Sequence, residues 1–554
     1  MNRKIIPLIG LCLYSFVCNA QESYKEASLK KGDSEYYANP IMHLDFSDPD
    51  VCRVGDDFWF TASSFSSVPG LPILHSKDLV NWQIVNYALP KLQPSALFDS
   101  VQPGKGVWAP CIRYHVGTYF IYWGDPDFGI YCIQTSDPSS SWSEPVLVKP
   151  GKGFIDPTPF WDEDGKAYLM HAYAASRTGF NSILVLQELS SDGTTVKGNP
   201  SIVFDGNDGV NHTCEGPKLY KRNGYYYVFC PAGGVEKGWQ LVLRSHNIYG
   251  PYESRIVMAQ GKSSINGPHQ GAWIDTPKGE SWFIHFQDKG LYGRVIHLNP
   301  MKWLNDWPVI GEDKDGDSCG EPMLTAKKPD IITSDSVAKM TFSDEFNTSA
   351  LGLQWQWQAN YQDAFGFPST NGFYRLYAYR QNLKNLWLAP NLLLQKFMAE
   401  TFVATSKLSF ASKDENERVG LIVMGSDYAA LTLRRKGKAF LLEQVLCKEA
   451  DKGNPEKYKE IAKFAPDRLI EGGLVPALVK EIYLRVEVKE GGNCRFAYSL
   501  DGVQFTEVGI AFQAQKGRWI GAKVGCFANG TNLKGGGGWV DLDWFRITST
   551  PLSK

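Results

Sequence analysis

Three acidic residues share one sequence context in the first half of the chain. Asp48 lies in SDPD, Asp156 in FIDPTPFW and Glu215 in CEGPKLY. Each is followed by proline one or two positions later, and each precedes a glycine-aromatic segment by seven to nine residues. One acid before a proline ordinarily caps a turn, but three in the same context indicate a shared site. Crowded carboxyl groups raise the pKa of at least one member, which provides a general acid and a general base at one pH.

The segments that follow these acids form a repeat, in which a polar turn with glycine leads into an aromatic, β-prone stretch. The five copies lie at Gly55, Gly117, Gly165, Gly224 and Gly279. Spacings of 48 to 62 residues and little helical periodicity predict a five-bladed β-propeller over 21–324. A large β-sandwich is the alternative, although its hairpins would follow more closely. Equivalent positions of propeller blades meet at the mouth of the central channel, so the three acids of blades one, three and four should face one site.

A second domain is expected after the repeats end. The stretch 325–339 is polar and rich in turn-forming residues and is predicted to be a linker. From 340 to 554 the sequence returns to alternating strands, which predicts a β-sandwich. The whole chain is therefore expected to be all-β.

Several acidic residues raise the question of metal binding. Asp313, Asp315 and Asp317 alternate like a calcium loop, but Leu324 stands where a bidentate glutamate would be required. A solvated acidic loop is therefore the preferred interpretation. Glu345 and Asp543 lie on the first and last strands of the second domain and could hold a structural calcium, or they could be turn acids without an ion.

The N-terminus and the composition restrict the classes of protein that fit. Residues 1–20 have a basic start, an apolar run and a small-residue cleavage point, which predicts a secretory signal and export to a Gram-negative periplasm. A formal net charge of −2 gives no basic footprint for nucleic acid, and no later segment is predicted to span a membrane. Nine of the eleven cysteines follow the signal and are scattered, so neither a disulfide framework nor a zinc cluster is expected, although Cys52 and Cys111 could form a bridge.

Separated motifs resemble glycoside hydrolase family 43, and they occur in the order of that family. They are NPIMHLDFSDPDVCRVGDDFWFTASS, WAP at Trp108, IDPTPFWDEDGKAYL, EGPKLYKRNGYYYVF and GPHQGAWIDT. The resemblance covers the mature chain and extends to the concanavalin-like sandwich of the family's xylosidases and arabinofuranosidases. It implies that Asp48 is the general base, Glu215 the general acid, and Asp156 the residue that orients Glu215 and tunes its pKa.

The resemblance also implies residues that bind the sugar. Arg294 matches an arginine that contacts substrate, or it forms a salt bridge in the last blade. Trp108 matches an aromatic wall, or it packs within a blade. His269 matches a channel histidine that binds substrate, or coordinates calcium or its waters in some members, or it is a buried histidine without metal. Asp50 is expected to face a turn and to take no direct part.

The expected function is exo-acting, inverting release of α-L-arabinofuranose from plant hemicellulose side chains of arabinoxylan or xyloglucan type, without a cofactor required for the chemistry. A β-D-xylosidase and a sugar-binding protein without turnover are the alternatives. Endo-acting arabinan cleavage would need an open groove. In related xylosidases a loop of the sandwich closes the sugar site. Here the loop with Phe365 and Phe367 differs, so these rings could enter the site or pack between the domains.

Overall fold

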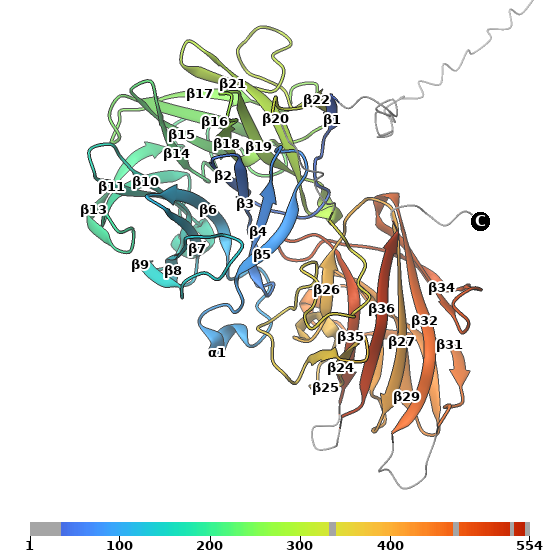
Figure 1. Ribbon diagram of the computed structural model, residues 1–554. Coiled ribbons are helices and arrows are strands. Elements are labelled where there is room, and N and C mark those ends of the chain that lie inside the picture. The colour runs from blue at the N-terminus through green and yellow to red at the C-terminus, as the bar shows by residue number, and fades with distance from the viewer. Residues whose placement is uncertain (1–34, 332–339, 469–475, 532–536, 549–554) are drawn as a thin grey trace, which may run out of the picture.

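The computed structural model describes residues 35–331, 340–468, 476–531 and 537–548, in two lobes (Figure 1). The predicted signal at 1–20 and most of the predicted linker lie outside these residues. At the start of that linker stretch, β22 (Thr325–Lys327) pairs with β1 (Tyr36–Ala38). Among the described residues, no helix has both the length and the apolar character that a membrane crossing requires.

The first lobe is the predicted five-bladed propeller, and each blade is a four-stranded antiparallel meander. Blade one comprises β2 (Asp50–Val54), β3 (Asp57–Thr61), β4 (Gly70–Ser76) and β5 (Gln83–Leu89). Blade two comprises β6 (Trp108–His115), β7 (Thr118–Asp125), β8 (Gly129–Thr135) and β9 (Val146–Pro150). The short helix α1 (Ser95–Phe98) connects these two blades.

The remaining blades repeat the same order of strands. Blade three comprises β10 (Phe154–Trp161), β11 (Ala167–Tyr173), β12 (Ile183–Leu189) and β13 (Val196–Asp205), with α2 (Ala175–Thr178) after β11. Blade four comprises β14 (Lys218–Arg222), β15 (Tyr225–Ala232), β16 (Trp239–Ser245) and β17 (Glu253–Met258). Blade five comprises β18 (His269–Asp275), β19 (Ser281–Asp288), β20 (Arg294–Leu304) and β21 (Trp307–Ile310), with the 3-10 helix η1 (Gly290–Tyr292) before β20. The innermost strands β2, β6, β10, β14 and β18 surround the centre of this lobe.

The second lobe is a sandwich of two seven-stranded β-sheets, as predicted. The first sheet contains β23 (Gly366–Ser369), β24 (Phe373–Tyr377), β36 (Trp539–Thr548), β27 (Phe402–Ser412), β32 (Ala477–Lys489), β33 (Asn493–Ser499) and β34 (Thr506–Gln513). The second contains β25 (Tyr379–Arg380), β26 (Leu393–Lys396), β35 (Lys523–Gly530), β28 (Arg418–Met424), β29 (Tyr428–Lys436), β30 (Ala439–Cys447) and β31 (Lys457–Phe464). Short 3-10 turns η2 (Leu386–Leu388), η3 (Ala450–Lys452) and η4 (Glu490–Gly492) connect strands of this lobe. Alternation of buried and exposed residues along β32 is the pattern expected for a strand with one face in the core.

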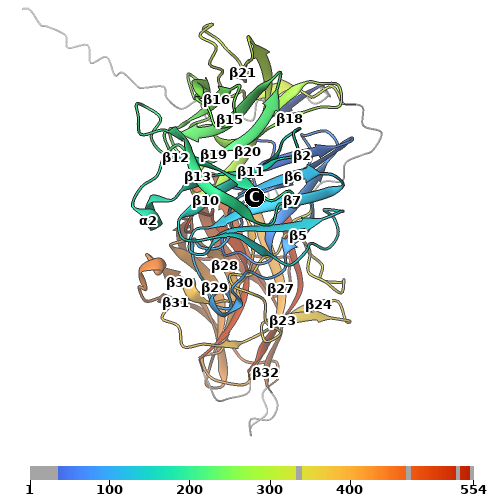
Figure 2. The ribbon, with the colours of Figure 1, turned by 90° about the vertical axis from the view of Figure 1, so that its left-hand side faces the viewer.

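The two lobes share a continuous apolar core, and Figure 2 shows the sandwich below the propeller. Backbone hydrogen bonds join Val68 of the propeller to Trp357 of the sandwich in both directions, at 3.0 and 2.6 Å. The buried amide of Asn360 bonds both backbone groups of Leu92, at 2.8 and 3.1 Å. The sandwich is therefore fixed against the propeller by buried polar contacts as well as by apolar packing.

Buried ionic contacts cross the inside of the propeller channel. Asp50 is fully buried, and its Oδ2 lies 2.7 Å from Arg113 and 3.9 Å from Lys218, so it joins blades one, two and four. This differs from the expectation that Asp50 faces a turn, because its partners come from other blades. Cys52 and Cys111 are both buried free thiols rather than a bridge.

Candidate active site

One backbone feature is repeated where each innermost strand begins. Five equivalent residues have positive φ angles of 36° to 60°: Asp48, Ala109, Asp156, Gly216 and Gln270. Only one of these five is glycine. The pairing register is irregular at this point in β6, β10 and β18, as in a β-bulge. Two consecutive residues of each blade therefore lie at the entrance to its innermost strand, with the second in the positive-φ conformation. Asp48 and Asp156 occupy the positive-φ position, while Trp108, Glu215 and His269 occupy the position before it.

Asp48 is buried and held by three neighbours. Its Oδ2 accepts hydrogen bonds from Ser63 Oγ at 2.6 Å and from Ser47 Oγ at 3.1 Å. Arg294 donates through an NH1 group to Oδ1 at 3.1 Å, which forms an ion pair. Ser63 also accepts from the backbone N–H of Ala109 at 2.7 Å, so the carboxylate is oriented by two blades.

Glu215 and Asp156 are neighbours across blades three and four. Burial and the negative charge of Asp48 raise the pKa of Glu215 to about 7, although Arg294 opposes this shift. Burial, Glu215 and Asp48 raise the pKa of Asp156 well above its usual range. Asp156 Oδ2 accepts from the backbone N–H of Gly216 at 2.8 Å. It therefore fixes the peptide that follows Glu215, which is a direct way to position that side chain.

His269 is fully buried and lies behind Glu215 rather than at an open surface. Its Nε2 lies 3.2 Å from Glu215 Oε1. Burial and the nearby Arg294 lower the pKa of His269 to about 3, so the ring is neutral at physiological pH. A neutral imidazole can exchange a hydrogen bond with either protonation state of Glu215, which suits a group that supports a general acid.

Trp108 and Arg294 both lie at this mouth of the channel, and both contact a residue of the sandwich. Trp519 packs edge-to-face on Trp108 with ring centroids 6.1 Å apart. The Arg294 guanidinium lies 5.9 Å from the centre of the Trp519 ring. Trp519 follows Arg518 in the loop 514–522 between β34 and β35 and is 42% exposed. The sequence prediction missed this residue, although an aromatic between glycines in KGRWIG was an available indication.

Asp45 connects the two sides of this mouth. Its buried carboxylate accepts the backbone N–H of Arg294 through Oδ1 and that of Gly521 through Oδ2, both at 2.8 Å. The first belongs to the strand that carries the arginine, and the second to the loop that carries Trp519. One carboxylate therefore sets the distance between two parts of the site. It was also missed, because Gly521 is 476 residues away.

The loop with Phe365 and Phe367 lies in the sandwich lobe. Phe365 is fully buried against Trp357, Tyr361 and Tyr379 in the core shared by the lobes. Phe367 lies on β23 beside Tyr377 and is 46% exposed. Phe365 therefore follows the second predicted outcome, packing between the domains, whereas Phe367 is exposed on the sandwich.

The predicted metal ligands have other partners in the structure. Glu345 forms a two-pronged ion pair with Arg546 at 2.7 and 2.8 Å, and Asp543 lies 3.0 Å from Lys407. The carboxylates therefore point to different cationic side chains. His269 Nδ1 has no hydrogen-bond partner among the described residues. His269 and Glu215 lack a third metal-ligating side chain within ligand distance in the described part of the chain.

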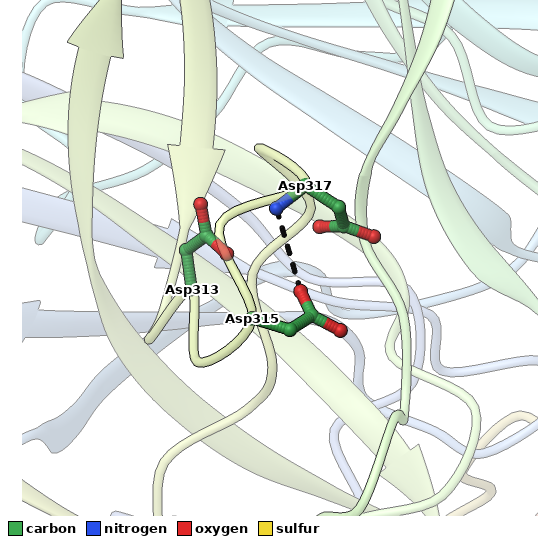
Figure 3. Close-up of side chains that lie close together, drawn as sticks. All are labelled: Asp313, Asp315 and Asp317. Carbon is green, nitrogen blue, oxygen red and sulfur yellow. Dashed lines mark hydrogen bonds between the residues drawn. The ribbon is translucent and has the colours of Figure 1, made fainter.

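The acidic loop at Asp313, Asp315 and Asp317 is the one such group in the described part of the chain, and Figure 3 shows its carboxylates around one turn. Asp313 accepts the backbone N–H groups of Gly316 and Ser318 at 2.8 and 3.1 Å. Asp315 accepts from Asp317 at 3.4 Å. These bonds are those of an acid-capped turn, and they account for the acids without a ligand.

Comparison with known proteins identifies the family of both lobes. Residues 37–308 match the model of glycosyl hydrolases family 43, and residues 343–548 match the beta xylosidase C-terminal concanavalin A-like domain. A Xylanibacter ruminicola protein named "Putative beta-xylosidase" is 37% identical over 90% of this chain and 86% of its own length. A non-reducing end alpha-L-arabinofuranosidase of Bacteroides ovatus is 30% identical over 79% of this chain and 80% of its own length.

Solved structures give the same result for the fold. A bifunctional protein of Bacteroides eggerthii, described as GH43-CE, has a TM-score of 0.79 at 27% identity, covering 93% of this chain and 64% of that chain. The sequence matches extend over both lobes, and the three carboxyl groups lie close enough to interact, as the propeller geometry predicted. The chain belongs to glycosyl hydrolases family 43 and is a glycoside hydrolase.

Proposed function

We propose that this enzyme releases single pentose units from the non-reducing ends of xylan-type chains, with inversion at the anomeric carbon and β-D-xylose as its first substrate. The observation that carries this proposal is that two carboxyl groups at the same mouth of the channel have different environments, one suited to donate a proton and the other to accept one. Glu215, with its pKa raised to about 7, holds a proton that it can donate. Asp48 is ion-paired to Arg294 and can accept one.

The proposed reaction is a single displacement. Asp48 takes a proton from water, whose oxygen attacks the anomeric carbon from the face opposite the leaving group. Glu215 gives its proton to the glycosidic oxygen as the bond to the sugar breaks, so the products are a free pentose and a shortened chain. Asp156 and His269 hold Glu215 in place through the Gly216 N–H and the 3.2 Å contact. No step requires a metal or an organic cofactor.

Exo-action is supported by the sandwich loop. Trp519 lies over the channel mouth between Trp108 and Arg294, where it would limit the passage of a continuing chain on that side. This arrangement favours a chain end over an internal linkage. Export to the periplasm remains part of the proposal and rests on the sequence of residues 1–20.

α-L-Arabinofuranose, the substrate expected from the sequence, is the second candidate. The Bacteroides ovatus relative supports it, whereas the more similar Xylanibacter ruminicola protein bears a xylosidase name. Arabinofuranose and xylopyranose present similar hydroxyl patterns, so the named residues can serve either sugar. Family membership and the three converging acids favour turnover over sugar binding alone.

The test compares initial rates on aryl β-D-xylopyranoside, aryl α-L-arabinofuranoside and xylobiose, for the wild type and Glu215→Gln. We expect the xyloside to be the faster aryl substrate and the variant to lose xylobiose hydrolysis. Proton NMR of the first product should show the α-anomer of xylose. Preference for the arabinofuranoside would select the second candidate, and a β-anomer from the xyloside would contradict the single-displacement mechanism.

A further inference from the structure

The end of the propeller channel away from the three acids contains a cavity of about 480 Å³. Its lining comes from the C-terminal parts of all five innermost strands, whereas the acids lie at the N-terminal ends of those strands. Asp156 and Asp162 mark the two ends along one chain segment, roughly 20 Å apart at about 3.3 Å per residue. We call this cavity the far-mouth site.

The far-mouth site is separated from the catalytic mouth by the channel interior. Asp50 and Lys218 are fully buried between the two, and Arg113 pairs with Asp50 at 2.7 Å. These ionic contacts close the channel to a sugar, so the cavity is a separate site and not an extension of the active site. Its volume falls in the range of small-molecule sites, about 300–1,000 Å³.

Aromatic rings form a large part of its lining. Tyr114 is 43% exposed and packs on Tyr119 with ring centroids 4.8 Å apart. His115 stacks on Trp161, with 4.7 Å between centroids and an angle of 8°. Tyr220 and Trp273 contribute two more rings from blades four and five. Flat apolar faces with polar edges suit the faces of sugar rings.

The charged groups of the lining have polar partners within the protein. Lys221 binds Asp162 and Glu163 at 2.6 and 3.1 Å. Asp275 accepts from Trp273 Nε1 at 2.7 Å and from Ser281 at 2.6 Å. Arg53 donates to a backbone oxygen at 2.7 Å.

Three basic and three acidic side chains line the cavity in total, which gives no net charge to attract a phosphate or an acidic peptide. Burial also lowers the pKa of His115, which keeps that ring neutral at physiological pH. The ligand that fits is a neutral molecule with many hydroxyl groups.

We propose that the far-mouth site is a second carbohydrate-binding site, which holds a neutral oligosaccharide segment of the polysaccharide on which the enzyme acts. The choice of a pentose chain as ligand rests on the proposed function, whereas the presence of a sugar site rests on the cavity alone. Binding at this mouth leaves the three acids free. It would keep the enzyme on a polymer between successive cleavages of chain ends.

The test measures retardation of the protein in native gels that contain soluble arabinoxylan, in the Glu215→Gln background so that the polymer is not consumed. Tyr114→Ala removes the exposed ring of the far-mouth site. We expect it to weaken polymer binding about tenfold, as for the loss of one aromatic contact in a shallow site. Tyr114→Trp should retain binding because it keeps a flat ring at that position.

The matched control is Tyr249→Ala, which removes a propeller tyrosine of similar exposure, 41%, outside the cavity. It should leave polymer binding unchanged, and all variants should keep their thermal midpoints. In the background with intact Glu215, Tyr114→Ala should leave kcat/KM for the aryl glycosides unchanged. The proposal would be overturned if Tyr114→Ala were retarded by the polymer as strongly as its parent, or if Tyr249→Ala lost as much polymer binding as Tyr114→Ala.

Failure of the proposed function has a different outcome. If neither aryl pentoside is hydrolysed while Tyr114→Ala still weakens binding, the second site stands and the substrate proposal falls. If both are hydrolysed and Tyr114→Ala binds polymer like its parent, the second site falls and the proposed function stands.

Discussion

Replacing Asp45 by asparagine should disconnect the two sides of the catalytic mouth. The carboxylate accepts the N–H groups of Arg294 and Gly521 through different oxygens, both at 2.8 Å. Asparagine keeps one acceptor and turns an NH₂ group toward the other N–H. A buried N–H left without an acceptor costs about 1–3 kcal/mol, which corresponds to about 5- to 150-fold in an equilibrium constant.

We expect that cost to appear in the loop that carries Trp519, because the strand of Arg294 is held by its ladder with β19 on one side. Release of the loop should lower kcat/KM for the xyloside by at least about fivefold. The thermal midpoint should fall by less than it would if the same free energy were lost from the stability of the whole fold, because the cost is confined to one loop. The quenching of tryptophan fluorescence should also change, because Trp519 leaves Trp108.

Asp501→Asn is the matched control for this experiment. Asp501 Oδ1 accepts two backbone N–H groups at 2.8 Å, from Val503 and Gln504, but it lies in an exposed turn of the sandwich. It should leave kcat/KM unchanged. If Asp45→Asn lowers the thermal midpoint while the folded protein retains the wild-type kcat/KM, the carboxylate is only structural and the reasoning fails.

Three further predictions concern the acid, the sandwich loop and a buried lysine. Because the pKa of Glu215 is raised to about 7 and the acid must be protonated, kcat/KM for xylobiose should fall above about pH 7; a profile flat to pH 9 would contradict this assignment. Trp519→Ala should lower kcat/KM about tenfold because ring contacts in the site are lost. Trp544→Ala on the same lobe should leave kcat/KM unchanged, and equal effects of the two substitutions would show that Trp519 has no specific role in the site. Burial lowers the pKa of Lys523 to about 7, below its unfolded value, so the unfolded chain binds more protons between about pH 7 and 10 and stability should rise with pH there. The free energy of unfolding in denaturant should be measured for the wild type and for Lys523→Met, and the difference between them should rise by up to about 2 kcal/mol between pH 7 and 9. A difference that does not change with pH would refute this prediction.

The sequence was sufficient to predict the blades and their acids for a local reason. A positive-φ residue lies at or just before the start of each innermost strand and precedes proline in four blades, so short motifs around Asp48, Asp156 and Gly216 carry the geometry. Aspartate and glycine are among the residues that adopt this conformation most readily. The repeat of glycine turns and aromatic strands then sets the number of blades.

The remaining features depend on contacts between distant parts of the chain. Asp50 has no neighbour in sequence that reveals its pairing with Arg113, because blade closure brings them together. Trp519 reaches Trp108 only after the sandwich has docked on the propeller. Phe365 was an equally suitable aromatic by residue type, and its burial follows from the path of the loop rather than from its own sequence. Local patterns therefore predict elements, whereas interlobe contacts require the assembled fold.

The residue types at the repeated positive-φ position also explain why the site has three acids and not five. Ala109 and Gln270 occupy the same backbone position as Asp48 and Asp156, in blades two and five. Further carboxyl groups there would face Asp48 and Glu215 across a buried channel with Arg294 as the one guanidinium paired to the base among the described residues. Each would place a further negative charge beside Asp48, which must accept a proton. Neutral side chains at these two positions keep the base and the acid in different protonation states, and catalysis by this pair depends on that difference.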